Sequence, residues 1–237
     1  MSTDPSTVLS MIDDFIIGGY SAARGRIESQ YTYAIQASGT GTPVMPSATI
    51  AQDGNHPGIV EFTTGAGTDG ASGIYGAGPS SGAHNLYLFL GAGAVTFECL
   101  FNIPTLSTAA DEYRIKVGLG RTMSNAGDTN GAFLTYYRPT SVNWRTNTIK
   151  ASTATAATSN SAVATGWTKL RIEANAAGTS VEFFINDVSI GVHTENIPTL
   201  GIGLIFSIDK LGGTTGTTPR LTGLDYWRTQ QTFTTAR

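Results

Sequence analysis

Few residues of this sequence stand where they could do nucleophilic, acid–base or metal chemistry. The three histidines, His56, His84 and His193, are far apart, and none has a metal-ligand partner at close spacing. Cys99 is the only cysteine and lies in an apolar run, which indicates a buried thiol and excludes a disulfide framework. We therefore expect no catalytic residue and no cofactor.

Two glycine-rich stretches match functional motifs in form only. Residues 65–70 (GAGTDG) satisfy the dinucleotide pattern G-x-G-x-x-G, and residues 78–82 (GPSSG) satisfy the hydrolase pattern G-x-S-x-G. Both motifs work at the start of a helix. The residues that follow the first motif, ASGIYGAGPSSGA, cannot form a helix, so we interpret both stretches as loops.

Residues 125–131 (NAGDTNG) gather oxygen-bearing side chains in a glycine-rich loop. Calcium takes six to eight oxygen ligands and usually more carboxylates than this loop supplies. A turn that bonds to its own backbone is the main interpretation, and a lectin-type calcium site is the alternative.

Tyr136, Tyr137 and Trp144 are the candidate contacts for a glycan or a partner, because aromatic rings with a polar tip can stack on sugars. Successive residues of a strand point to opposite faces, so one of the two tyrosines is expected in the core. Packing in the core is the main interpretation of these aromatic residues, and a stacking platform for a sugar is the alternative.

The elements that would position these residues are strands separated by turns. In residues 167–175, Leu170, Ile172 and Ala174 alternate with charged residues, and Asn186-Asp187 forms a tight turn between two further strands. Residues 7–15 could form a short helix capped by Ser6. The uncharged run 151–165 is interpreted as a loop held by neighbouring chains. Strands are also predicted at 59–64, 85–90, 95–103, 112–119, 131–138, 141–146, 180–185, 188–194, 202–210 and 220–229.

The composition limits the classes of partner. Charged residues make up 13% of the chain, against about 25% in a typical soluble domain, so Thr, Ser, Asn and Gly must fill the surface. The net charge of −3 gives no basic stripe for nucleic acid. No apolar run reaches the roughly 20 residues of a membrane span, and no signal peptide is evident. The length of 237 residues suits a single domain over 11–237 with an N-terminal arm over 1–10.

The spacing W-x-x-L-x-I-x-x-N-x-x-G-x-x-V-x-F-x-I-N, starting at Trp167, resembles the concanavalin-like (laminin-G-like) jelly-roll sandwich. The closing run LDYW at 224–227 is expected to return beside the opening run DDFI at 13–16. The order of motifs from DDFIIGG to NIPT is similar to jelly-roll domains of tailed-phage virion proteins, of the decoration or tail-fibre type, over residues 11–230. The expected fold is therefore an all-β sandwich of two antiparallel sheets.

The resemblance also implies what the chain does. Glycosidases on this scaffold carry Glu-x-Asp-x-Glu on one strand, and no such run is present, so we expect no enzyme. The expected function is a structural protein of the phage exterior, a capsid decoration or cement protein that contacts other virion proteins, with a homotrimer as its candidate state. It would be assembled in the host cytoplasm. The arm would anchor it through Asp4, Pro5, Val8 and Leu9. The alternative is a tail or fibre module that binds a host surface glycan.

Overall fold

The computed structural model describes residues 7–16, 19–21, 26–28, 30–45, 47–75, 88–121, 128–210 and 215–235. These residues form strands and no helix, and thus no helix that could cross a membrane. The strands are β1 (Val8–Asp13), β2 (Gly19–Ser21), β3 (Arg26–Glu28), β4 (Thr32–Ser38), β5 (Thr42–Val44), β6 (Val60–Thr63), β7 (Ala71–Tyr75), β8 (Gly93–Ile103), β9 (Arg114–Gly120), β10 (Asn130–Tyr137), β11 (Ser141–Lys150), β12 (Thr153–Ala162), β13 (Gly166–Ala174), β14 (Val181–Ile185), β15 (Val188–His193), β16 (Gly203–Asp209) and β17 (Leu221–Phe233).

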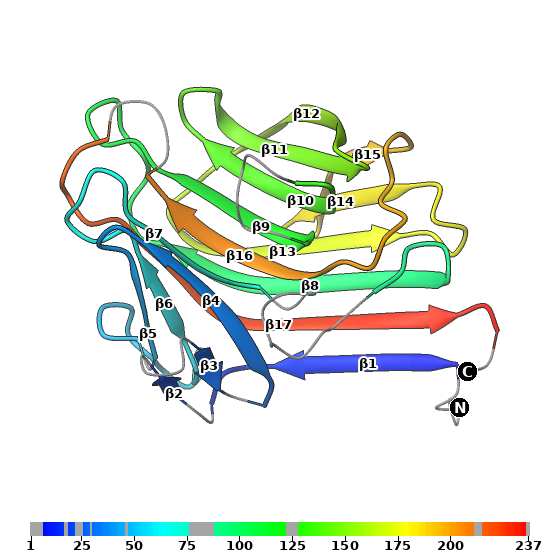
Figure 1. The fold of residues 1–237 in the computed structure, drawn as a ribbon, viewed down its shortest axis with the longest axis horizontal. Coiled ribbons are helices and arrows are strands. Elements are labelled where there is room, and N and C mark those ends of the chain that lie inside the picture. Colours follow the sequence, from blue (N-terminus) through cyan, green and yellow to red (C-terminus); the bar gives the residue numbers. More distant parts are fainter. Residues whose placement is uncertain are drawn as a thin grey trace.

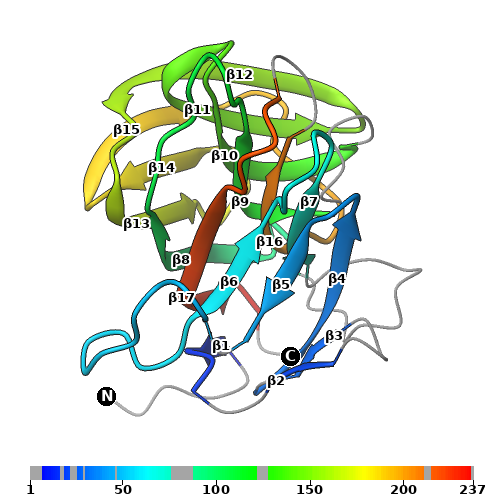
Figure 2. The ribbon, with the colours of Figure 1, turned by 90° about the vertical axis from the view of Figure 1, so that its left-hand side faces the viewer.

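The strands build two antiparallel sheets that pack face to face, as the sequence predicted (Figures 1 and 2). The eight-stranded sheet has the order β15-β14-β13-β8-β17-β6-β5, with β1 beside β17. The nine-stranded sheet has the order β12-β11-β10-β9-β16-β7-β4-β3-β2. Neighbours such as β9 and β16 are far apart in the sequence, so the sheets close by the crossover connections of a jelly roll.

Strand alternation places the core between the sheets. Leu170 and Ile172 of β13 face inward, as predicted, and meet Val117 and Leu119 of β9 in one buried cluster. Asn186 and Asp187 have positive φ angles of 50° and 65° and make the predicted tight turn between β14 and β15. In the predicted strand 85–90, residues 85–87 lie outside the described part, and Leu88 makes an isolated bridge with Ile202.

The N-terminal segment corrects two expectations. Residues 8–13 form β1 and not a helix, because each of them pairs with a residue of β17, from Val8 opposite Thr232 to Asp13 opposite Trp227. An isolated helix of this length is marginal in water, whereas the strand gains a full ladder of backbone hydrogen bonds. The sandwich therefore begins at Val8, inside the expected arm, and the first and last strands lie side by side as predicted (Figure 1).

The uncharged run after β11 is also a strand and not a loop. Thr153–Ala162 forms β12, the edge of the nine-stranded sheet, and pairs with β11 from Lys150 opposite Thr153 onward. Ala151 and Ser152 form a two-residue turn with φ angles of 47° and 68°. The segment is ordered by β11 of its own chain, so its order does not require a neighbouring chain.

Candidate functional site

A polar row crosses the outer face of the nine-stranded sheet, the face turned away from the core. Ile115, Val117 and Leu119 of β9 point into the core, so the residue between the first two, Lys116, points outward. The strand register sets Thr135 of β10 and Ser207 of β16 on either side of Lys116, and Arg145 of β11 beside Thr135. We call Arg145, Thr135, Lys116 and Ser207 the central row.

On each side of the central row, a further line of outward-facing residues crosses the sheet. These two lines contribute aromatic rings and an ion pair to the face. On one side, Phe133 of β10 lies under Lys116, with Nζ 4.3 Å from the ring centroid, and Tyr75 of β7 pairs with Ile205. Phe133, Ile149 and Ile205 form a small second cluster of buried apolar residues, with Tyr75 packed against it. These residues give the polar row an apolar border.

On the other side of the central row, Arg114 of β9 lies between Tyr137 of β10 and Asp209 of β16. Arg114 donates from Nη2 and Nε to Asp209 Oδ2 at 2.5 and 3.0 Å. The Tyr137 side chain is half-buried. Across the face, the rows that contain aromatic rings thus lie beside rows or positions with charged hydrogen-bonding groups. This combination suits an amphipathic ligand.

Lys116 and Asp128 form a buried ion pair over this face. Lys116 Nζ donates to Asp128 Oδ2 at 2.5 Å, and the two side chains are 1% and 9% exposed. Burial lowers the pKa of Lys116 from its ordinary value, and the nearby Asp128 carboxylate opposes this shift. Burial likewise raises the pKa of Asp128, opposed by the Lys116 ammonium. Perturbed pairs of this kind occur often at functional sites.

The outer face also holds most of the unsatisfied polar atoms of the described residues. Among the described residues, five buried side-chain atoms lack a hydrogen-bond partner, and three of them lie on this face: Asp128 Oδ1, Arg145 Nε and Ser207 Oγ. Buried polar atoms are nearly always hydrogen-bonded in folded proteins, and each unpaired one costs about 1–3 kcal/mol. These three atoms therefore mark a polar and partly desolvated region of the face, and the half-buried Arg145 has exposed surface there for a ligand.

The structure separates the three aromatic residues predicted to contact a glycan. Tyr136 and Trp144 are 2% and 1% exposed and lie in the core, where their rings pack 6.2 Å apart with Trp144 edge-on to Phe101. Neither can stack on a sugar, so the core interpretation holds for both. Tyr137 points to the opposite face, as strand alternation required, and lies at the border of the central row.

The candidate anchoring residues are also separated. Val8 and Leu9 are held in β1, opposite Thr232 and Gln231, and Leu9 packs against the core. They cannot form a loose arm without breaking that ladder. Asp4 and Pro5 lie outside the described residues.

The glycine-rich motif at 65–70 is a tight loop, as expected. Gly65 has a φ angle of 64°, and the amide of Gly67 donates to Thr40 Oγ1 at 2.6 Å. No helix follows, because β7 begins at Ala71. The motif at 78–82 and His84 lie outside the described residues.

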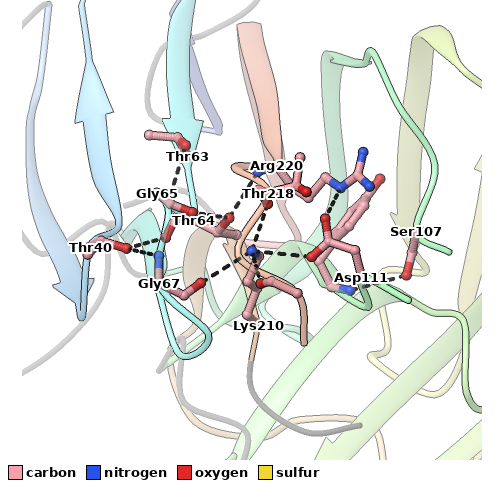
Figure 3. Close-up of polar contacts among 12 residues, drawn as sticks. Thr40, Thr63, Thr64, Gly65, Gly67, Ser107, Asp111, Lys210, Thr218 and Arg220 are labelled. Atoms are coloured by element: carbon pink, nitrogen blue, oxygen red, sulfur yellow. Dashed lines mark hydrogen bonds and ion pairs between the residues drawn. The ribbon is translucent and has the colours of Figure 1, made fainter. Parts of the chain in front are cut away.

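This loop is fixed by a buried lysine (Figure 3). Lys210 Nζ donates to the carbonyl oxygens of Gly67, Gly216 and Thr218 at 3.2, 2.5 and 2.7 Å. It also lies 3.3 Å from Asp111 Oδ1. The ammonium is surrounded by partners from its own chain, so we interpret the cluster as a clamp that joins three loops and not as a ligand site.

The proposed calcium loop is described only in part, since residues 125–127 fall outside. Asp128 pairs with Lys116, and Asn130 Oδ1 accepts a hydrogen bond from the Thr199 amide at 3.3 Å. Among the described residues, no three His, Cys, Asp or Glu side chains come together as a metal site. These described oxygens do not converge on one point.

The remaining titratable candidates take part in packing. His56 stacks on Trp167 with ring centroids 3.7 Å apart, and its Nδ1 lies 2.8 Å from Asp225 Oδ2. Cys99 is fully buried, and burial raises the pKa of its thiol well above the ordinary value. The buried thiol predicted from the sequence is confirmed.

The two antiparallel sheets form a jelly-roll sandwich of the concanavalin-like, lectin-like fold class. Within this class, the chain belongs to the family described as SO2946-like, C-terminal domain, whose model matches residues 55–225. No curated protein matches the chain.

Three solved structures show the same fold. The protein of unknown function SO2946 from Shewanella oneidensis MR-1 is 15% identical, with 98% of this chain and 89% of that chain covered and a TM-score of 0.61. The carbohydrate recognition domain of Emp47p is 9% identical, with 97% and 99% covered and a TM-score of 0.56. The endo-1,3-beta-glucanase of Streptomyces sioyaensis is 13% identical, with 98% and 99% covered and a TM-score of 0.50. The fold is thus shared by a sugar-binding domain and a hydrolase.

Proposed function

We propose that this chain is a non-enzymatic carbohydrate-binding module whose ligand lies on the outer face of the nine-stranded sheet. The observation that carries the proposal is that the half-buried Tyr137 and the half-buried Arg145, whose Nε lacks a hydrogen-bond partner, lie on that face. Saccharides present many hydroxyl groups that both donate and accept hydrogen bonds, and they present apolar ring faces. The polar row and the neighbouring Tyr137 match both features.

Among the described residues, Asp128 and Asp209 are acidic side chains on the outer face that a hydrolase could use there. Glycoside hydrolysis needs one carboxyl group as acid and a second as base or nucleophile, both directed at the scissile bond. Here each carboxylate is held by a cation at 2.5 Å, Asp128 by Lys116 and Asp209 by Arg114. This engagement supports binding without turnover.

The test is a glycan array followed by calorimetry with the best ligand. We expect saturable binding that Tyr137→Ala weakens about fivefold or more, since stacked rings contribute on the order of 1 kcal/mol or more. Tyr226→Ala is the matched control, because Tyr226 is a half-buried tyrosine on the outer face of the other sheet. Absence of any ligand, or equal loss in both variants, would overturn the proposal.

Turnover is checked in the same samples by measuring new reducing ends. Release of product that disappears in Asp128→Asn or Asp209→Asn would show a hydrolase and contradict the non-enzymatic part of the proposal. A bound glycan that stays intact over a day supports it.

The second candidate function is the virion role, as a capsid decoration protein or a tail-fibre component, which rests on the resemblance of the sequence. The exposed edge strand β12 favours it, because its side chains are uncharged and its outer backbone edge has no partner strand among the described residues. Another chain could add a strand there. The test is native mass by light scattering, with stripped phage capsids added afterwards. A trimer that binds capsids would support this role, and a monomer that does not bind them would contradict it.

A further inference from the structure

We infer that the ligand of the outer face is an anionic saccharide and that Arg145 selects it. The inference rests on the proposed carbohydrate-binding function and specifies the class of glycan. It starts from the charges on the face. Arg114 and Lys116 each have a carboxylate partner, whereas Arg145 has no acidic side chain within ion-pair distance among the described residues.

The Arg145 guanidinium is placed as a binding group. Its side chain is half-buried on β11, and Nε is buried without a hydrogen-bond partner. A partly desolvated cation without a counter-charge is unfavourable, and the penalty is relieved when an anion binds. The planar guanidinium matches a carboxylate or a sulfate through two parallel hydrogen bonds, which a neutral hydroxyl cannot replace.

The other polar groups in and beside the central row suit the hydroxyl groups of a sugar and not its acidic group. Ser207 is 5% exposed, and its Oγ is buried and unpaired, while Asp128 Oδ1 is a buried acceptor without a donor. Ser207 lies three strands from Arg145, about 14 Å at roughly 4.8 Å per strand. A ligand that covers the row from end to end is therefore of oligosaccharide length, with its acidic group at the β11 side.

The same charges argue against other polyanions. The outer face carries carboxylates at Asp128 and Asp209 close to its cations, and the whole chain has a net charge of −3. Nucleic acid needs several unpaired cations along its backbone. One unpaired guanidinium next to hydroxyl groups fits a single acidic sugar.

The experiment compares acidic and neutral oligosaccharides on one array. The acidic oligosaccharides form two sets, one carboxylated and one sulfated. Each member is matched to a neutral counterpart, which is the methyl ester for a carboxylated chain and the desulfated chain for a sulfated one. We expect binding to the acidic members and loss with their neutral counterparts. The set that binds identifies carboxylate or sulfate as the recognised group.

Three variants test the role of Arg145. Arg145→Gln should weaken binding of the acidic ligand at least about tenfold, and Arg145→Lys less, because it keeps the charge and loses the planar fork. Arg228→Gln changes the net charge equally on the other sheet, where Arg228 is 58% exposed, and should leave binding unchanged. If Arg145→Gln fails to fold, the affinity of Arg145→Lys for the acidic and neutral ligands is the test.

The outcomes distinguish the two proposals. Equal binding of neutral and acidic ligands, or acidic binding that Arg145→Gln and Arg145→Lys leave unchanged, would overturn this inference while the carbohydrate-binding proposal stands. Absence of binding to every glycan would overturn both.

Discussion

At the residue scale, Trp144 and Tyr137 show how position on a strand decides the role of an aromatic ring. Trp144 points inward, is 1% exposed and packs edge-on against Phe101 with ring centroids 5.8 Å apart. Tyr137 points outward and is half-buried beside Arg114. Only the second ring can meet a ligand without unfolding the sandwich.

Trp144→Ala should therefore reduce stability directly. Removing a large buried ring leaves a cavity and costs about 3–5 kcal/mol. The free energy of unfolding, measured by urea denaturation, should fall by that amount, whereas Tyr137→Ala should cost much less. A Trp144→Ala protein with an unchanged midpoint would show that the ring is not part of the core.

His193 gives a pH dependence whose sign follows from its burial. Its Nε2 lies 2.8 Å from Thr146 Oγ1 and its Nδ1 lies 2.9 Å from Thr148 Oγ1, and burial lowers its pKa from the ordinary value of about 6.5. The unfolded chain then binds a proton more readily than the folded chain. The His193 contribution is present above about pH 6.5 and is lost as the pH falls through the lower folded pKa.

The measurement compares melting temperatures at pH 7.5 and pH 5.0. The wild-type protein should lose more stability between these values than His193→Gln does. Equal losses in the two proteins would show that the buried imidazole is not responsible.

At the element scale, local patterns predict the strands whose signals are contained in their own residues. The β13–β14–β15 meander was predicted because Leu170 and Ile172 alternate with charged residues and because Asn186 tolerates a positive φ angle. β12 was missed because its Ala, Thr and Ser side chains show no apolar alternation. Its strand conformation is set by pairing with β11, which no local pattern reports.

The turn between β11 and β12 offers a stability test at this scale. Ala151 and Ser152 both have positive φ angles, which cost ordinary residues about 1 kcal/mol or more and which Asn-Gly adopts readily. The double change Ala151→Asn with Ser152→Gly should raise the melting temperature by about 2–4 °C. Asn186→Ala, at the equivalent turn, should lower it, because Asn186 Oδ1 also accepts the Lys169 amide at 2.9 Å. A lowered midpoint in the double variant would contradict the turn geometry.

At the scale of the whole molecule, the candidate site depends on strand order. Arg145, Thr135, Lys116 and Ser207 come from four strands, and β9 meets β16 only after the chain has crossed between the sheets. The sequence predicted the sandwich, but the register that aligns these four residues is a long-range property. For the same reason, the sequence indicates aromatic residues that are close to one another along the chain. Of these residues, only Tyr137 lies on the outer face of the nine-stranded sheet.

The shared fold supports sugar binding in one relative and hydrolysis in another, so the function of this chain depends on its own face. The most direct measurement is the mapping of backbone amide chemical shifts while the best glycan from the array is added. We predict shifts confined to β9, β10, β11 and β16, centred on Thr135, Lys116 and Arg145. Shifts confined to β8, β13 and β17 of the other sheet, or none at saturating glycan, would contradict the account.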